Sequence, residues 1–135
     1  MKQHAQFTSI VTALILGLSL SWQAFAADDP SIKGDLRSNI QQSMQSYIDQ
    51  QSIDGDMYVY DAKKGKLLKL QLTKLHDGIV KKGDFYVSCA DFHDQQGRKI
   101  DVDFMVRTSG DRFVTTQALI HSVEGKKRKY HLEKL

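Results

Sequence analysis

The chain contains only one cysteine, one proline and one tryptophan among its 135 residues. Because Cys89 has no second cysteine to pair with, no disulfide can form within the chain, and packing must supply the stability. A free cysteine is most often buried as a small apolar side chain, so we expect Cys89 to be buried. A reactive thiol and a homodimer linked through Cys89 stay open as alternatives. Pro30 precedes the patterned part of the sequence, so no later helix or strand is interrupted by proline.

The sequence also lacks an apolar run long enough to cross a membrane, which takes about 20 residues. The apolar run from Ile10 to Leu20 follows Lys2 and precedes Ala24-Phe25-Ala26, a small-x-small pattern typical of signal-peptide cleavage. We therefore predict a signal peptide over 1–26 and one domain over 27–135, a length that fits a single core. We expect a periplasmic or secreted location, with no stable membrane anchor after cleavage.

An excess of charge of one sign is missing as well. The chain has 19 basic and 16 acidic residues, and removing Lys2 with the leader leaves 18 basic ones. Such a balance does not favour nucleic acid as a partner, and export makes that partner less suitable still. The basic run at 126–129 is interpreted as a solvated turn that protects an edge strand. The expected partner is a protein or small-molecule ligand of unknown identity, and no cofactor is expected.

An amphipathic helix is predicted from about Asp35 to Gln51. Its apolar positions recur at steps of three and four, and Asp35 is placed to cap the free amides of its first turn. The predicted buried face consists of Leu36, Ile40, Met44, Tyr47 and Ile48.

Segments of β-strand character follow the helix, separated by glycine-containing turns. The predicted strands are 57–60, 66–75, 84–92, 99–106, 112–123 and a closing segment at 129–132. The stretch at 76–79, His-Asp-Gly-Ile, is interpreted as a turn, so His76 is expected to be a turn residue. His121 falls late in a strand and is expected to be packed or exposed rather than catalytic.

One helix followed by about five antiparallel strands predicts an α+β fold, with the helix packed across one face of a curved sheet in two layers. This order resembles the cystatin-like and nuclear-transport-factor-like folds, and it is similar to small exported bacterial domains of unknown function. The resemblance covers the mature chain in outline and implies only the fold. Because no motif with assigned catalytic residues matches, no site residue is carried over, and fold alone does not transfer function.

The turn Asp94-Gln95-Gln96-Gly97 decides which side chains share a face of the hairpin around it. Aspartate first and glycine fourth favour a type I turn with a bulge, in which Cys89 faces Asp103 and Asp91 faces Asp101. A two-residue loop would instead place Cys89 opposite Val102 in the core. Turn chemistry favours the first register and burial of Cys89 the second; we prefer the bulged hairpin. Its predicted core face is Tyr86, Ser88, Ala90, Phe92, Ile100, Val102, Phe104 and Val106.

The other face of this hairpin carries the candidate ligand-binding residues. These are Asp91, His93, Asp101 and Asp103. Two carboxylates directly opposite each other repel, so solvent, a cation such as Lys99 or Arg107, or a metal must offset them. The preferred interpretation is a solvated strand face, because half-exposed antiparallel sheets alternate polar and apolar residues. No metal site and no catalytic residue are assigned.

The sequence therefore favours a small exported binding or interaction module. The alternative is a small periplasmic enzyme, or a metal-binding protein, that uses this aspartate- and histidine-bearing face of the 85–107 hairpin. The spacing of serine, cysteine and histidine matches no nucleophile-elbow or cysteine-protease signature.

Overall fold

A computed structural model describes residues 27–130, so the predicted signal peptide and residues 131–135 lie outside the described part. The described chain forms one helix and one seven-stranded antiparallel sheet, whose strands follow one another in chain order. The elements are α1 Gly34–Gln50, β1 Ser52–Ile53, β2 Asp56–Asp61, β3 Lys66–Lys82, β4 Phe85–Asp94, β5 Lys99–Ser109, β6 Arg112–Val123 and β7 Lys126–Lys127. Within 27–130, no helix is both long and apolar enough to cross a membrane.

Helix α1 buries the predicted face. Ile40 and Met44 are fully buried and Ile48 nearly so, while Leu36 and Tyr47 pack at the margin of the same core. The predicted cap is wrong, because the helix begins one residue earlier and Asp35 lies inside its first turn. The carboxylate of Asp35 still lies near the positive end of the helix dipole, which favours a negative charge there.

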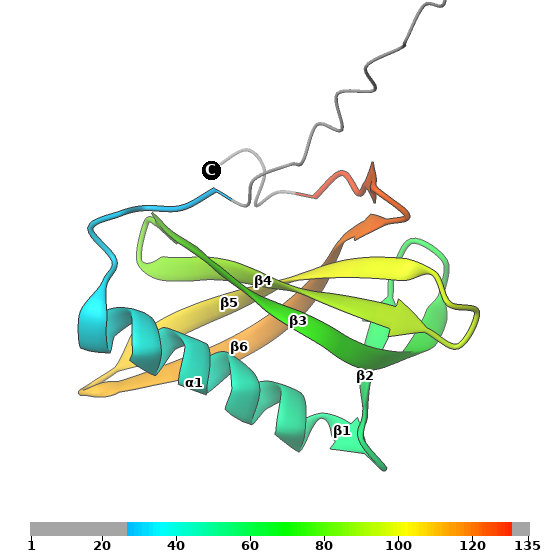
Figure 1. Ribbon diagram of the computed structural model, residues 1–135, viewed down its shortest axis with the longest axis horizontal. Helices are drawn as coiled ribbons and strands as arrows, with labels where there is room; N and C mark the ends of the chain where they lie inside the picture. Colours follow the sequence, from blue (N-terminus) through cyan, green and yellow to red (C-terminus); the bar gives the residue numbers. More distant parts are fainter. Residues whose placement is uncertain (1–26, 131–135) are drawn as a thin grey trace, which may run out of the picture.

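The helix crosses one face of the sheet, where it contacts β5 and β6 (Figure 1). The Tyr47 ring meets the Phe104 ring edge-on, with centroids 6.1 Å apart. Opposite the helix, the inner face of the sheet supplies the rest of the core: Met57, Val59, Leu70, Ile79, Ala90, Phe92, Ile100, Val102, Phe104 and Val106. The α+β class and the antiparallel sheet are therefore as predicted.

The number of strands differs from the prediction. Five longer strands, β2 to β6, are joined by the two-residue strands β1 and β7 at the two ends of the sheet. The predicted turn at 76–79 is wrong, because β3 continues through it to Lys82. Lys129 and Tyr130 form no strand, and the rest of the predicted closing segment lies outside the described residues.

The β4–β5 hairpin has the preferred, bulged register. The amide of Asp94 donates to the carbonyl of Arg98 at 3.1 Å, and the amide of Gly97 donates to the carbonyl of Asp94 at 2.9 Å. Gly97 has φ +74°, a left-handed conformation that glycine adopts without steric cost. Cys89 pairs with Asp103 and Asp91 with Asp101, so the predicted core face points toward the helix.

Bulges interrupt both neighbouring pairings, and one bulge in each places a histidine outside the regular alternation. Between β3 and β4, Leu75 pairs with Ala90 and Ile79 with Ser88, so residues 76–78 lie opposite the single position of Cys89. Between β5 and β6, Asp101 pairs with Ser122 and Val102 with Ile120, which makes His121 the extra residue. A bulge redirects a side chain out of the regular alternation.

Candidate functional site

The face of the sheet that points away from the helix contains a cleft of about 650 Å³. Strands β4 and β5 contribute its acidic side chains, and the bulged parts of β3 and β6 contribute a histidine each. The segment after β7 adds Tyr130, and three lysines lie at the cleft as well. The histidine, cysteine and aspartate residues that line the cleft are His76, Cys89, Asp91, Asp101, Asp103 and His121.

The expectation of a solvated face does not hold at the centre of the hairpin. Cys89 and Asp103 point away from the helix, yet only 8% and 6% of their surfaces are exposed. Asp103 accepts hydrogen bonds from two other segments. His121 Nδ1 lies 3.2 Å from its Oδ1, and the Tyr130 hydroxyl donates to its Oδ2. Cys89 is therefore buried as expected, although the register places it on the outer face.

Asp91 sits between two basic groups. Both His76 Nε2 and Lys99 Nζ lie 3.1 Å from its Oδ2. Burial works to raise the pKa of Asp91, but the close contacts with Lys99 and His76 outweigh it and hold that pKa below its usual value. Lys99 is thus one of the two cations expected to offset the Asp91–Asp101 pair. Arg107 is not, because it pairs with Asp84 at 2.7 Å.

Asp101 is the least compensated carboxylate of the cleft. Its Oδ2 lies 3.6 Å from His121 Nδ1, whereas its Oδ1 is shielded from solvent and accepts no hydrogen bond from a nitrogen or oxygen donor. Burial raises the pKa of Asp101. His121 counteracts that rise, and the negative charges of Asp103 and Asp91 add to it. The carboxylate form of Asp101 therefore lacks a full set of partners.

His121 is held by Asp103 and by an aromatic neighbour. The hydrogen bond with Asp103 raises the pKa of His121, because it stabilises the charged imidazolium more than burial destabilises it. The ring of Tyr130 meets the His121 ring edge-on at 5.7 Å. His121, Asp103 and Tyr130 thus form one linked group at the β6 side of the cleft.

The thiol of Cys89 is not activated. Burial raises its pKa well above the ordinary value, and the carboxylates of Asp101, Asp103 and Asp91 raise it further. A nucleophilic cysteine needs the opposite, a positive environment that favours the thiolate. A cation placed among these groups would reverse the effect, since metal-bound thiols are deprotonated.

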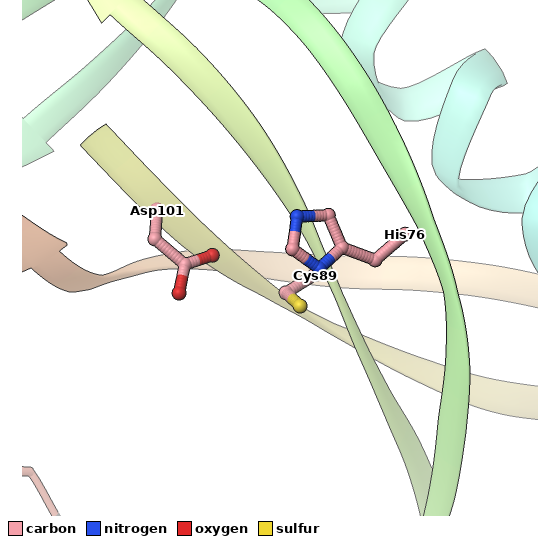
Figure 2. Close-up of side chains that lie close together, drawn as sticks. All are labelled: His76, Cys89 and Asp101. Carbon is pink, nitrogen blue, oxygen red and sulfur yellow. The ribbon is translucent and has the colours of Figure 1, made fainter. Parts of the chain in front are cut away.

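Two groups of side chains in the cleft have the composition of metal ligands. In each, the donor atoms lie within 4.8 Å of one another: His76, Cys89 and Asp101 in one, and Asp101, Asp103 and His121 in the other. Figure 2 shows the first group, in which the imidazole, the sulfur and the carboxylate come from three adjacent strands and point toward one another.

Three of the four predicted site residues line the cleft, namely Asp91, Asp101 and Asp103. His93 does not, and its Nδ1 lies 2.9 Å from the hydroxyl of Thr73 on exposed surface. Sequence reasoning missed His76 and His121, because both lie in bulges that alternation does not reveal. It also missed Tyr130, for which the sequence holds no signal.

Comparison with known proteins identifies no relative of this chain. No family model, curated protein or solved structure matches this chain.

Proposed function

We propose that this protein is a small exported binding protein that holds a cation in the cleft on the outer face of its sheet. The observation that carries the proposal is the convergence of Asp91, Asp101 and Asp103 on one partly enclosed cleft. Export of the protein remains a prediction, and so does the likeness of its fold to the cystatin-like outline. Neither of them supplies the ligand.

Three lysines balance the three aspartates of the cleft in formal charge, but the local surroundings of Asp101 support a positively charged ligand. Asp91 and Asp101 lie directly opposite each other across β4 and β5, an arrangement in which like charges repel. Lys99 compensates Asp91, and His121 compensates Asp103. Asp101 retains a buried oxygen without a nitrogen or oxygen hydrogen-bond donor, and a bound cation would supply the missing positive charge.

Binding is favoured over nucleophilic catalysis. The raised pKa of the Cys89 thiol leaves it protonated at neutral pH, and the Nδ1 of His121 faces carboxylates. The space beneath the helix is filled by core side chains such as Phe92 and Phe104. A deep acidic pocket at that place would have favoured an enzyme.

The test is a thermal-shift survey of cations on the purified protein, covering Zn²⁺, Ca²⁺, Mg²⁺ and the polyamine spermidine. A ligand that binds only the folded state raises the melting temperature, because it stabilises that state by RT ln(1 + [L]/Kd). We expect at least one of these cations to stabilise the wild type, and Asp101→Asn to remove that effect. The matched control is Asp111→Asn, an exposed aspartate in the β5–β6 turn, which should keep it. Absence of any cation-dependent shift would refute the proposal.

A further inference from the structure

We infer that the cation is a divalent transition-metal ion such as Zn²⁺, bound by His76, Cys89 and Asp101. This inference rests on the proposed cation-binding function and adds the identity of the ion and its ligands. It assigns a metal-binding role to the only cysteine of the chain and to a histidine that the sequence pattern placed in a turn.

The geometry fits one ion. In a tetrahedral site Zn²⁺ lies about 2.0–2.3 Å from its nitrogen, oxygen and sulfur ligands, so two donors are separated by about 3.3–3.8 Å. The donor atoms of His76, Cys89 and Asp101 lie within 4.8 Å of one another, so side-chain adjustments of about 1 Å bring them to that separation. The residues come from β3, β4 and β5, so the sheet itself holds the ligands in place (Figure 2).

The surroundings of the Asp101 carboxylate are a second observation that indicates a bound ligand. Its Oδ1 is buried without a nitrogen or oxygen donor, a state that costs free energy unless a partner compensates it. Its other oxygen lies 3.6 Å from His121 Nδ1, and His121 contacts Asp103. At 3.6 Å the contact between His121 and Asp101 is electrostatic rather than a hydrogen bond, so His121 does not occupy the Asp101 carboxylate through a hydrogen bond.

The types of donor atom in this group favour some cations over others. A thiolate, an imidazole and a carboxylate suit zinc and related transition metals, whereas Ca²⁺ and Mg²⁺ prefer shells of six or more oxygens. A polyamine would gain nothing from Cys89, which is a weak hydrogen-bonding group. Three protein ligands leave a fourth position, and the cleft provides space beside the ion for water or a small ligand.

A second ion among Asp101, Asp103 and His121 is less favoured. Asp103 already accepts hydrogen bonds from His121 and from Tyr130, so its carboxylate is satisfied within the protein. A metal ion there would have to displace His121 from the Asp103 carboxylate. We therefore assign one ion to the cleft, with His121 and Asp103 as outer groups.

The first measurement is isothermal titration of the metal-free, reduced protein with Zn²⁺, together with Ca²⁺ and Mg²⁺. We expect one Zn²⁺ per chain and at least about 100-fold weaker binding of Ca²⁺ and Mg²⁺. Co²⁺ then serves as a spectroscopic probe, because a cobalt–thiolate bond gives an intense near-ultraviolet charge-transfer band. That band reports on Cys89 in the wild-type protein and needs no variant.

The variants His76→Asn, Cys89→Ser and Asp101→Asn should each weaken Zn²⁺ binding at least about 100-fold, and Cys89→Ser should also lose the cobalt band. His93→Asn is the matched control, since His93 lies on the same face of β4 as Cys89 but outside the cleft. It should bind Zn²⁺ as the wild type does. Metal-free melting curves identify any variant that fails to fold, and Cys89→Ala then replaces Cys89→Ser.

The outcomes separate the two proposals. Stabilisation by spermidine, Ca²⁺ or Mg²⁺ without stronger binding of Zn²⁺ overturns the metal assignment and leaves cation binding intact. Zn²⁺ binding that survives Cys89→Ser and lacks the cobalt band, or that His93→Asn weakens equally, also overturns the assignment. If no cation binds, both proposals fail.

Discussion

At the scale of single residues, Asp103 shows how a polar side chain on an outer strand face becomes part of the interior. Neighbouring Val102 and Phe104 point toward the helix, so Asp103 points away from it. It is nevertheless buried, because His121 and Tyr130 donate to its two oxygens. A buried carboxylate is tolerated when its lone pairs are satisfied in this way.

Asp103→Asn should therefore destabilise the metal-free protein by about 1–3 kcal/mol, the usual cost of breaking hydrogen bonds to a buried charged group. The amide that replaces the carboxylate carries no charge to pair with His121, and its NH₂ group cannot accept from either donor. Urea unfolding at neutral pH measures the change. Asp111→Asn, at an exposed turn position, should stay within about 0.5 kcal/mol of the wild type. A stability unchanged by Asp103→Asn would contradict the buried, partnered role.

At the scale of elements, the β4–β5 hairpin depends on the turn that begins at Asp94. The Asp94 side chain accepts from the amides of Gln96 and Arg98, both at 2.9 Å, and pairs with the Arg98 guanidinium. Burial works to raise the pKa of Asp94, but the hydrogen bonds from Arg98 and Gln96 prevail and lower that pKa. These contacts fix the turn and, with it, the register that aligns Cys89 with Asp103.

Asp94→Asn should cost about 1 kcal/mol at pH 7, because the neutral amide loses the ion pair with Arg98. A carboxyl with a lowered folded-state pKa stabilises the fold above its unfolded pKa, which is about 4. That contribution disappears as the pH falls through the folded-state pKa. The stability difference between wild type and variant should thus be full at pH 7 and shrink toward pH 3. Urea midpoints measured across this range test it, and a constant difference would rule out the carboxylate as its source.

The helix is the second element on which the fold depends. Ile40 is fully buried against the sheet, so Ile40→Asp would place a charge in the core without a partner. That cost is comparable with the total stability of a small domain, about 5–15 kcal/mol, so cooperative folding should be lost. Gln42→Asp, on the exposed face of α1, is the control and should fold normally. A sharp thermal transition in Ile40→Asp would show that the helix face is wrongly assigned.

At the scale of the whole molecule, the segment before the helix ties the β3 bulge in place. The amide of Asp29 donates to the carbonyl of Ile79 at 2.8 Å, and Asp28 Oδ1 accepts from the Ile79 amide at 3.1 Å. Arg37 of the helix pairs with Asp28 at 2.8 Å and also donates to the carbonyl of Asp77. The start of the described chain and the helix therefore both support the bulge that presents His76.

The small residues at 24 and 26 predict a mature chain that begins at Ala27. Intact mass of the protein recovered after export should correspond to 27–135. Ala26→Arg, which removes the small residue before the cleavage point, should leave the leader attached. A wild-type product that retains Trp22 would contradict the predicted cleavage site.

The sequence by itself determined the features that depend on local periodicity. Steps of three and four identified the buried helix positions, and alternation with Gly97 at the turn identified the inner face of the hairpin. Both are consequences of backbone geometry, which repeats every 3.6 residues in a helix and every two in a strand. Asp91, Asp101 and Asp103 were assigned to one face on the same grounds.

Only the tertiary structure decided what those outward-facing residues meet. Residues 76–78 and His121 leave the regular alternation at bulges, and a bulge is defined by the partner strand rather than by the sequence around it. Burial of the outer face likewise depends on distant segments, among them Tyr130. Alternation predicts which way a side chain points, whereas its neighbours depend on how the whole chain packs. For this reason a face that the sequence predicts to be solvated contains the cleft.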